Sequence, residues 1–242
     1  MPVNSARIRP DRALFAIGDT HGCVAQLTQM FDRLDEVARG DEICVFLGDY
    51  VDRGPQSREV LLLLYKLSQS TPERVICLMG NHERMLLNFI DDPAGGGAGW
   101  LRNGGVETLT SFGIEVPEDA IQSGATVDLA MRLEKALPRG LQEWLRTLPK
   151  QWSTGNIHCV HAAMSPKRPP DDQRGAVLLW GHPDFLTTPR SDDNIVVHGH
   201  TVVRQAGMSG NRIAVDTGAH LTGRLTAAHI TRGQCRFIEV RS

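Results

Sequence analysis

The sequence predicts an α/β fold in which two mixed β-sheets pack face to face between flanking helices. The first sheet is indicated by three apolar runs, rich in aliphatic and β-branched residues and each ended by a glycine, at 14–17, 43–47 and 75–79. Helical periodicity follows each run, and such β-α alternation is typical of a parallel or mixed sheet covered by helices. A second sheet is indicated by five later strand-like runs, at 157–160, 195–198, 212–215, 225–230 and 235–240.

Helical periodicity defines the segments between these strands. Apolar residues recur at helical spacing and the segments end near glycine or polar residues. Helices are expected from Val24 to Gly40, from Arg58 to about Gln69, from the loop at 80–82 to about Ile90, over 106–112, and over 128–148 with an interruption at 138–140.

Residues 91–104 interrupt this alternation. Asp91-Asp92-Pro93 and the four glycines between 95 and 99 are poorly suited to a regular element. We expect a surface loop near the mouth of a functional site, and a flexible connector fits this composition equally well. The whole chain, 1–242, is expected to form one domain with a loop or helical cap insertion at about 91–150.

The composition argues against several classes of partner. The chain has 242 residues, 41% of them hydrophobic, which is ordinary for one globular domain. A net charge of -2 gives no basic surface for nucleic acid, and no block of Lys and Arg suggests a membrane surface. The longest dense apolar stretch, Val60 to Tyr65, is too short to span a bilayer, and residues 1–12 lack the apolar core of a secretion signal. We expect a soluble cytoplasmic protein that binds neither nucleic acid nor membranes.

The cysteines fit a reducing compartment. Their odd number and scattered spacing, without a C-x-x-C pair, argue against a disulfide framework and a zinc knuckle. Cys23 lies beside the first polar motif described below, where either a redox role or simple packing is conceivable.

Three polar strings follow the early strands directly. They are Gly18-Asp19-Thr20-His21-Gly22, Gly48-Asp49-Tyr50-Val51-Asp52-Arg53-Gly54 and Gly80-Asn81-His82-Glu83. The carboxyl ends of neighbouring parallel strands meet at one sheet edge, where open α/β sheets bind ligands. One such string alone could be a tight turn with a capping Asp. Three in order, followed by histidines after two later strands, at His161 and at His198-Gly199-His200, indicate a dinuclear metal site.

The donor set suits a particular chemistry. Carboxylate, amide and imidazole ligands favour Mn, Fe or Zn, and Asp49 is best placed to bridge two ions. Two cations about 3.5–4 Å apart can bind phosphoryl oxygens and hold a water acidified to hydroxide between them. The sequence therefore predicts metal-dependent phosphoester hydrolysis, with two divalent ions, most readily manganese, as cofactors.

A leaving alkoxide also needs a proton. His82 is the expected general acid, because imidazole titrates near neutral pH, and Asp52 could orient it. Arg53 offers a planar fork that matches phosphate oxygens, although Asp52 and Arg53 could also form only a surface ion pair. Three histidines without an acidic companion in sequence are interpreted as structural: His158, His220 and His229.

The ordered motifs resemble those of the calcineurin-like metallophosphoesterases, and within them the bacterial and phage serine/threonine phosphatases of the phosphoprotein-phosphatase branch. The resemblance implies a four-layer sandwich of two sheets and flanking helices. It also implies that Asp19 and His21 hold the first metal, that Asp49 bridges, and that the second metal is held by Asn81, His161 and His200. His82 would be the general acid, Asp52 its partner and Arg53 a phosphate clamp.

The chain departs from this family pattern after Trp180. Related phosphatases tend to carry a phosphate-binding arginine two residues after this tryptophan, where this chain has His182. His182 and Asn103 are therefore candidates for substrate contact, and the missing arginine could be replaced by Arg168, Arg174 or Arg190. His198 is either a residue behind the ligands or a strand-end residue.

The expected function is a serine/threonine protein phosphatase-like phosphomonoesterase acting on phosphoproteins or small phosphoesters. A symmetrical dinucleoside-tetraphosphate hydrolase would use similar motifs. A catalytically silent phosphate-binding scaffold would be expected to lack ligands, yet all six candidates are present. The sequence leaves the oligomeric state, the physiological substrate and the metal open.

Overall fold

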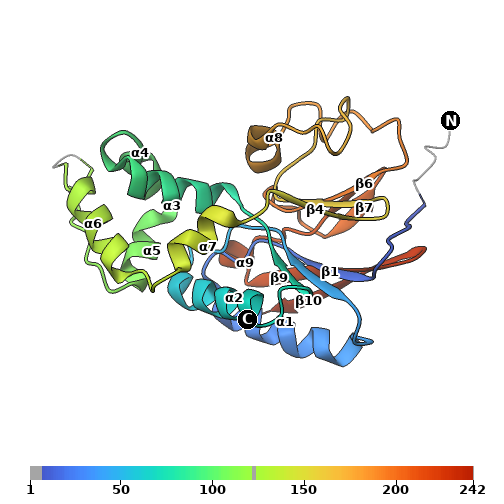
Figure 1. Ribbon diagram of the computed structural model, residues 1–242, viewed down its shortest axis with the longest axis horizontal. Helices are drawn as coiled ribbons and strands as arrows, with labels where there is room; N and C mark the ends of the chain where they lie inside the picture. Colours follow the sequence, from blue (N-terminus) through green and yellow to red (C-terminus); the bar gives the residue numbers. More distant parts are fainter. Residues whose placement is uncertain (1–6, 122–123, 242) are drawn as a thin grey trace.

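Two five-stranded sheets form the centre of the computed structural model, which describes residues 7–121 and 124–241 (Figure 1). The first sheet has the order β10-β9-β1-β2-β3, with bounds Gln234–Arg241, Arg224–Thr231, Leu14–Ile17, Ile43–Phe46 and Val75–Cys77. The second sheet has the order β4-β5-β6-β8-β7, with bounds Gln151–Thr154, Ile157–Val160, Ile195–His198, Arg212–Ala214 and Gly207–Ser209.

Both sheets are mixed, as the alternation of strands and helices predicted. β1, β2 and β3 run parallel, whereas β9 pairs with β1 antiparallel. The expectation that the runs 225–230 and 235–240 belong to the second sheet was wrong, because β9 and β10 extend the first sheet beside β1. In the second sheet β5, β6 and β8 run parallel and the outer strands β4 and β7 are antiparallel. The parallel strands of each sheet therefore deliver their carboxyl ends to a common edge.

Side-chain alternation along the strands creates separate apolar layers. On β1, Leu14 and Ala16 pack in the core between the two sheets, and Phe15 and Ile17 pack in the core beneath the helices. The helices α1 (Val24–Val37) and α2 (Ser57–Ser70) cover this outer face of the first sheet. On the second sheet, α8 (Gly175–Trp180) covers the opposite face through Leu178. The predicted four-layer arrangement is confirmed.

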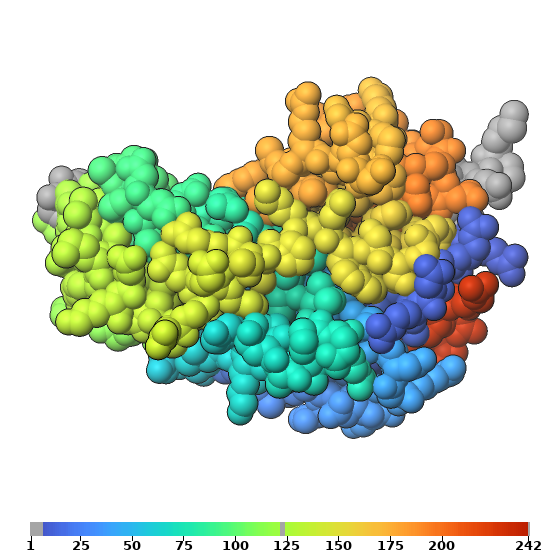
Figure 2. All heavy atoms as spheres, in the orientation of Figure 1, coloured from blue at the N-terminus to red at the C-terminus, as the bar shows by residue number. Residues whose placement is uncertain are grey.

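A run of short helices occupies the middle of the chain and gathers at one end of the molecule (Figures 1 and 2). Its members are α3 (Asn81–Asp91), α4 (Pro93–Trp100), the π-helix η1 (Leu101–Gly105), α5 (Val106–Ser111), α6 (Thr126–Ala136) and α7 (Leu141–Thr147). Figure 2 shows them as a green to yellow lobe beside the sheets. That this lobe is an insertion into one domain remains a prediction.

The prediction of a loop over 91–104 was wrong for most of this segment, which is helical as far as Arg102; Asn103 and Gly104 have non-helical angles and form a kink. Asp92 caps α4 by accepting a hydrogen bond from Gly95 N at 3.0 Å, and Pro93 occupies the first turn, where its missing N–H costs nothing. Trp100 is 1% exposed and packs on Phe89, which anchors the far end. Capping and burial at the two ends therefore outweigh the low helix propensity of the glycines.

Several short elements had no clear pattern in the sequence. They are β4, β7, α8 and the four-residue helix α9 (Ala219–Thr222). Across 7–121 and 124–241, no helix combines the length and apolarity needed to cross a lipid bilayer.

Candidate metal centre

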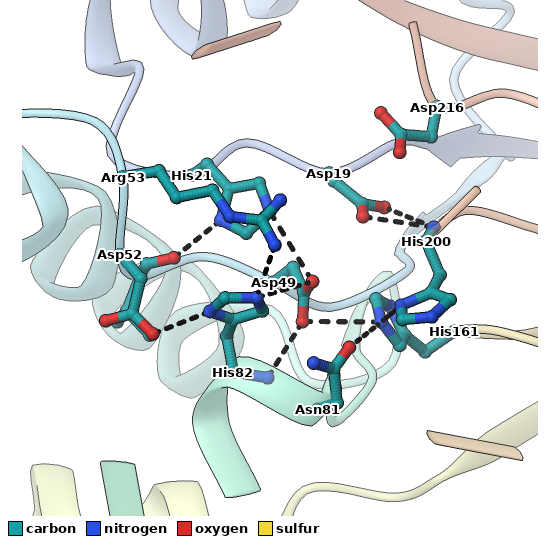
Figure 3. Close-up of polar contacts among 12 residues, drawn as sticks. Asp19, His21, Asp49, Asp52, Arg53, Asn81, His82, His161, His200 and Asp216 are labelled. Atoms are coloured by element: carbon teal, nitrogen blue, oxygen red, sulfur yellow. Dashed lines mark hydrogen bonds and ion pairs between the residues drawn. The ribbon is translucent and has the colours of Figure 1, made fainter. Parts of the chain in front are cut away.

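The predicted ligands converge because each follows the carboxyl end of a parallel strand (Figure 3). The strands of the first sheet supply the loops with Asp19, His21 and Asp49, and Asn81 begins α3 after β3. The strands β5 and β6 of the second sheet supply His161 and His200. The site therefore lies across the boundary between the two sheets.

Asp49 is common to two groups of donor atoms. One group comprises His21, Asp49 and His82, and the other comprises Asp49, His161 and His200, with the donor atoms of each group within 4.8 Å of one another. Asp49 Oδ2 lies 3.5 Å from His21 Nε2, and Asp49 Oδ1 lies 3.3 Å from His161 Nε2. One carboxylate thus faces both groups, which is the arrangement that a bridging ligand requires.

The surroundings of His161 fit a cation. His161 Nδ1 lies 3.0 Å from the carbonyl oxygen of Leu47, which can only accept, so Nδ1 carries the proton. Burial lowers the pKa of His161 to about 3, so the ring is neutral and Nε2 bears a lone pair. That lone pair points at Asn81 Oδ1, 2.8 Å away, and at Asp49 Oδ1. Converging lone pairs repel one another unless a positive charge lies among them.

His21 has the same orientation. Its Nδ1 lies 2.7 Å from the carbonyl oxygen of Val51, so its Nε2 lone pair also faces the site. Burial, together with the charges of His82 and Arg53, holds the pKa of His21 well below its usual value. Both histidines are therefore fixed as neutral donors by backbone carbonyls behind them, which is the usual support for a metal-bound imidazole.

Buried carboxylates add a negative field to the site. Burial and the neighbouring charges of Asp216 and Asp49 raise the pKa of Asp19 well above its usual value. Asp19 accepts two hydrogen bonds from His200 N, at 3.0 and 3.2 Å, and it is not a member of either donor group above. Its role as a ligand of the first metal remains a prediction.

Glu83 connects two of the polar loops. Its carboxylate is fully buried and accepts hydrogen bonds from Asp49 N at 2.8 Å, Tyr50 N at 2.7 Å and Gly80 N at 2.9 Å. These donors belong to the loops after β2 and β3. Glu83 therefore fixes the spacing between the backbone of Asp49 and that of Asn81.

The backbone of the site is strained. Among the described residues, left-handed backbone angles at residues other than glycine are confined to the site, at His21, Asp49, Asp52, Arg53 and His200. Such conformations cost about 1–3 kcal/mol each and persist only where surrounding contacts hold them. The loops also approach very closely: a Cβ on Gly54 would lie 1.9 Å from the carbonyl oxygen of His21.

His82 and Asp52 form a buried pair beside the donor groups. His82 Nδ1 donates to Asp52 Oδ2 at 2.6 Å, which leaves Nε2 toward the site. Arg53 donates to that Nε2 at 2.9 Å and to His21 Nε2 at 3.1 Å. The surface ion-pair alternative is therefore wrong, because Asp52 is 0% exposed and Arg53 turns into the site.

The substrate candidates lie outside this constellation. His182 lines a hollow of about 350 Å³ with Trp180 and His200, and its Nδ1 accepts a hydrogen bond from Asp184 N at 3.1 Å. Asn103 is exposed and donates to the carbonyl oxygen of Gly99 at 2.8 Å. Their contact with substrate remains a prediction.

Two of the arginines considered as replacements are held elsewhere. Arg168 pairs with Asp172, four residues further along the chain, and Arg190 pairs with Asp192, two residues further along. His198 packs its ring on Phe185 and is 2% exposed, which favours its interpretation as a strand-end residue. Burial raises the pKa of the Cys23 thiol to about 11, which favours packing over redox chemistry.

Sequence reasoning missed several residues around the centre. Asp216 directly follows the strand run at 212–215, so the pattern that identified the other loops could have found it. The ring of His220, interpreted as structural, lies 4.7 Å from that of His21. Trp100 and Thr108 reach Asp52 from the helical lobe, and no local pattern indicates this. His229, thought to lack an acidic companion, lies 3.5 Å from Glu42.

Comparison with known proteins agrees with this geometry. The family model of the calcineurin-like phosphoesterases matches residues 13–220. A symmetrical bis(5'-nucleosyl)-tetraphosphatase from Janthinobacterium sp. (strain Marseille) is 27% identical over 258 residues, covering 90% of this chain and 92% of the relative. A Caenorhabditis elegans protein described as a candidate serine/threonine-protein phosphatase is 45% identical over 74 residues, covering 31% of this chain and 20% of the relative.

The chain spans less than half the length of several relatives that it matches, including that nematode protein. Among solved structures, a protein described as a candidate diadenosine tetraphosphatase has a TM-score of 0.64 at 21% identity, with 97% of each chain covered. At that level of identity the likeness concerns the fold.

Proposed function

Because the chain belongs to the calcineurin-like phosphoesterase family, we propose that it is a metal-dependent phosphomonoesterase that hydrolyses phosphoserine and phosphothreonine esters. The observation that carries this proposal is the position of Asp49 in both donor groups, with neutral imidazole lone pairs directed at its two oxygens. A site for one ion, or a purely structural site, would not require one carboxylate to face two groups of donor atoms.

The six predicted residues divide into two sets around the shared carboxylate. Asp19 and His21 would hold one divalent ion with Asp49, and Asn81, His161 and His200 would hold the other. Bound there, the ions supply charge neutralisation for the phosphoryl oxygens and lower the pKa of water. The oxygen and nitrogen donors suit manganese, and also iron or zinc.

His82 would deliver the proton that the leaving oxygen needs. Its Nδ1–H is held by Asp52, and its Nε2 faces the site, where it accepts from Arg53. Once Arg53 binds the phosphoryl group instead, a proton taken up at Nε2 would be directed toward the leaving oxygen. Burial lowers the pKa of His82, whereas the charge of Asp49 raises it, and the 2.6 Å contact with Asp52 fixes the orientation of the ring. General acid catalysis of this kind contributes about 10²–10⁴-fold in rate.

Arg53 would orient the phosphoryl group. Its guanidinium spans the gap between His21 Nε2 and His82 Nε2, with one N–H group directed at each. A planar fork in that position matches two phosphoryl oxygens, which is a geometry that lysine cannot reproduce.

A second candidate function is favoured by the relatives' names. Several relatives, including one aligned over most of this chain, are named symmetrical bis(5'-nucleosyl)-tetraphosphatases. The same residues would serve hydrolysis of a dinucleoside tetraphosphate, because the non-bridging oxygens of its reacting phosphorus could be clamped in the same way. Its phosphate leaving group is less basic than an alkoxide and depends less on an acid.

A substrate panel tests both candidates. The metal-stripped protein is assayed with Mn, Zn and Fe separately on a phosphoserine peptide, diadenosine tetraphosphate and an aryl phosphate, with Asp49→Asn as the control. Faster turnover of the phosphopeptide supports the protein phosphatase proposal, and faster turnover of the dinucleotide supports the second candidate. Absence of metal-dependent turnover on every substrate would reject both.

A further inference from the structure

We propose that Trp100 and Thr108 are positioning residues for the Asp52–His82 pair, which makes the helical lobe a part of the catalytic apparatus. This inference rests on the proposed function of His82 as general acid. It concerns residues 48 and 56 positions away from Asp52 in the sequence, in a segment for which the sequence predicted a surface loop near the mouth of the site and a helical cap.

Both side chains bind the carboxylate of Asp52. Trp100 Nε1–H donates to Oδ2 at 2.9 Å, the same oxygen that accepts from His82 Nδ1. The Thr108 hydroxyl donates to Oδ1 at 2.7 Å. With donors on both oxygens, the carboxylate plane is fixed, and rotation that would weaken the bond to His82 is opposed by two further hydrogen bonds.

Thr108 and a neighbouring residue of the lobe also support the strained backbone at Asp52 and Arg53. Thr108 Oγ1 accepts a hydrogen bond from Asp52 N at 2.8 Å, and the carbonyl oxygen of Gly104 accepts one from Arg53 N at 3.2 Å. Asp52 and Arg53 have consecutive left-handed angles, φ 72° and 69°. A conformation of this cost requires external contacts, and the lobe supplies contacts to both backbone amides.

The contacts are buried and tightly packed. Asp52 and Thr108 are 0% exposed and Trp100 is 1% exposed, so water does not replace a lost donor readily. A Cβ on Gly105 would lie 2.5 Å from the indole ring of Trp100, so a glycine is needed where the chain passes the ring. Phe89 packs on the other part of the indole, with ring centroids 4.5 Å apart.

The chemical consequence concerns substrates with poor leaving groups. An alkoxide leaves only when it receives a proton, whereas a nitrophenolate leaves readily without one. A misaligned His82 therefore slows hydrolysis of an alkyl phosphate much more than hydrolysis of 4-nitrophenyl phosphate. Loss of metal binding or general unfolding would slow both equally.

The test uses Trp100→Phe and Thr108→Val, which remove one donor each and retain the shape of the side chain. Matched controls are Trp144→Phe and Thr126→Val, the same changes at buried positions of the lobe that do not contact Asp52. We expect kcat on a phosphoserine peptide to fall about tenfold or more with KM unchanged, and kcat on 4-nitrophenyl phosphate to fall less than about threefold. Equal losses on the two substrates, or losses matched by the controls, would overturn the proposal.

A double-mutant comparison tests whether Trp100 acts through the carboxylate of Asp52. In an Asp52→Asn background, adding Trp100→Phe should cause no further loss on the phosphoserine peptide, because the tryptophan acts through the carboxylate that is gone. A full additional loss would assign Trp100 some other role and would contradict the proposal.

An NMR measurement separates this proposal from the proposed function. The Nδ1–H resonance of His82, in 15N-histidine-labelled protein, should shift or broaden in Trp100→Phe and stay in place in Trp144→Phe. If the parent protein hydrolyses no phosphoester, the proposed function fails while this resonance still reports the positioning. An unchanged resonance in Trp100→Phe would reject the positioning role.

Discussion

Replacing Glu83 by glutamine tests whether the metal loops depend on one buried carboxylate. The change removes a single acceptor oxygen at nearly constant volume. In the parent protein Oε2 accepts from Asp49 N at 2.8 Å and Gly80 N at 2.9 Å, whereas Oε1 accepts from Tyr50 N at 2.7 Å and Val51 N at 3.4 Å. In the variant, one pair of backbone N–H donors would face the remaining side-chain oxygen, and the other pair would face the new NH₂ group.

The expected loss of stability comes from the pair of donors that is bound less tightly, Tyr50 N and Val51 N. The amide will keep its oxygen toward Asp49 and Gly80, because both of those bonds are short. Tyr50 N–H then loses a charge-assisted bond inside the protein and Val51 N–H loses a long one, which together cost about 2–4 kcal/mol. Removing a negative charge from beside Asp49 offsets part of this, since burial and Asp49 together raise the pKa of Glu83 to about 8. We therefore expect a net loss of about 2–3 kcal/mol, a large share of a typical stability of about 5–15 kcal/mol.

The assay is urea unfolding at about pH 9, above the raised pKa of Glu83, with a chelator present so that metal binding does not contribute to stability. Glu239→Gln is the control, because Glu239 pairs with Arg224 and Arg241 at a partly exposed edge, where such pairs contribute about 0–1 kcal/mol. A loss below about 0.5 kcal/mol for Glu83→Gln, or a gain, would show that the four backbone donors do not need this carboxylate.

Three further predictions use other contacts. Gly199→Ala should lower activity at least about tenfold, because its Cβ would lie 2.1 Å from Asp19 Oδ1, whereas Gly207→Ala, with no atom within 4 Å, should leave steady-state activity unchanged. Arg53→Ala should raise KM for phosphoesters about tenfold or more, through loss of charge-assisted bonds to the phosphoryl group, and an unchanged KM in initial-rate assays would remove Arg53 as a clamp. Arg190 lowers the pKa of Asp192 to about 2. The pair therefore stabilises the fold at pH values above the usual carboxyl pKa, and this stabilisation is lost as the pH falls through about 2. Asp192→Asn should lower the stability by at most about 1 kcal/mol, because Asp192 is partly exposed. In urea titrations this difference from the parent should disappear between about pH 4 and about pH 2, and a difference that stays constant would contradict the pairing.

The convergence of the site could be predicted from sequence because strands deliver residues in a regular way. Asp19, Asp49 and Asn81 each follow a buried parallel strand closely, so their arrival at one edge follows from strand direction alone. The two later histidines follow strands of the second sheet by the same rule. That the two edges meet depends on the packing of one sheet on the other, through the apolar core that Leu14 and Ala16 share with strands of the second sheet.

The first part of the helical lobe, over 91–104, escaped prediction for a physical reason. Its glycines gave a local signal for a loop, but the decisive contacts are the Asp92 cap and the burial of Trp100 against Phe89. The hydrogen bonds from Trp100 and Thr108 to Asp52 join residues about fifty positions apart and have no sequence periodicity. Long-range polar contacts of this kind depend on how the lobe packs and not on local propensity.

The division of the candidate metal donors between the two sheets has a consequence for biosynthesis. Asp19 emerges from the ribosome early, yet His161 and His200 are made only in the last third of the chain. A nascent chain that has completed the first three strands therefore has half a coordination shell, with its carboxylates unpaired and its affinity for cations low. Such long-range closure is slow compared with helix formation. The complete set of donors is therefore assembled only after the strands of the second sheet have been made and have packed on the first.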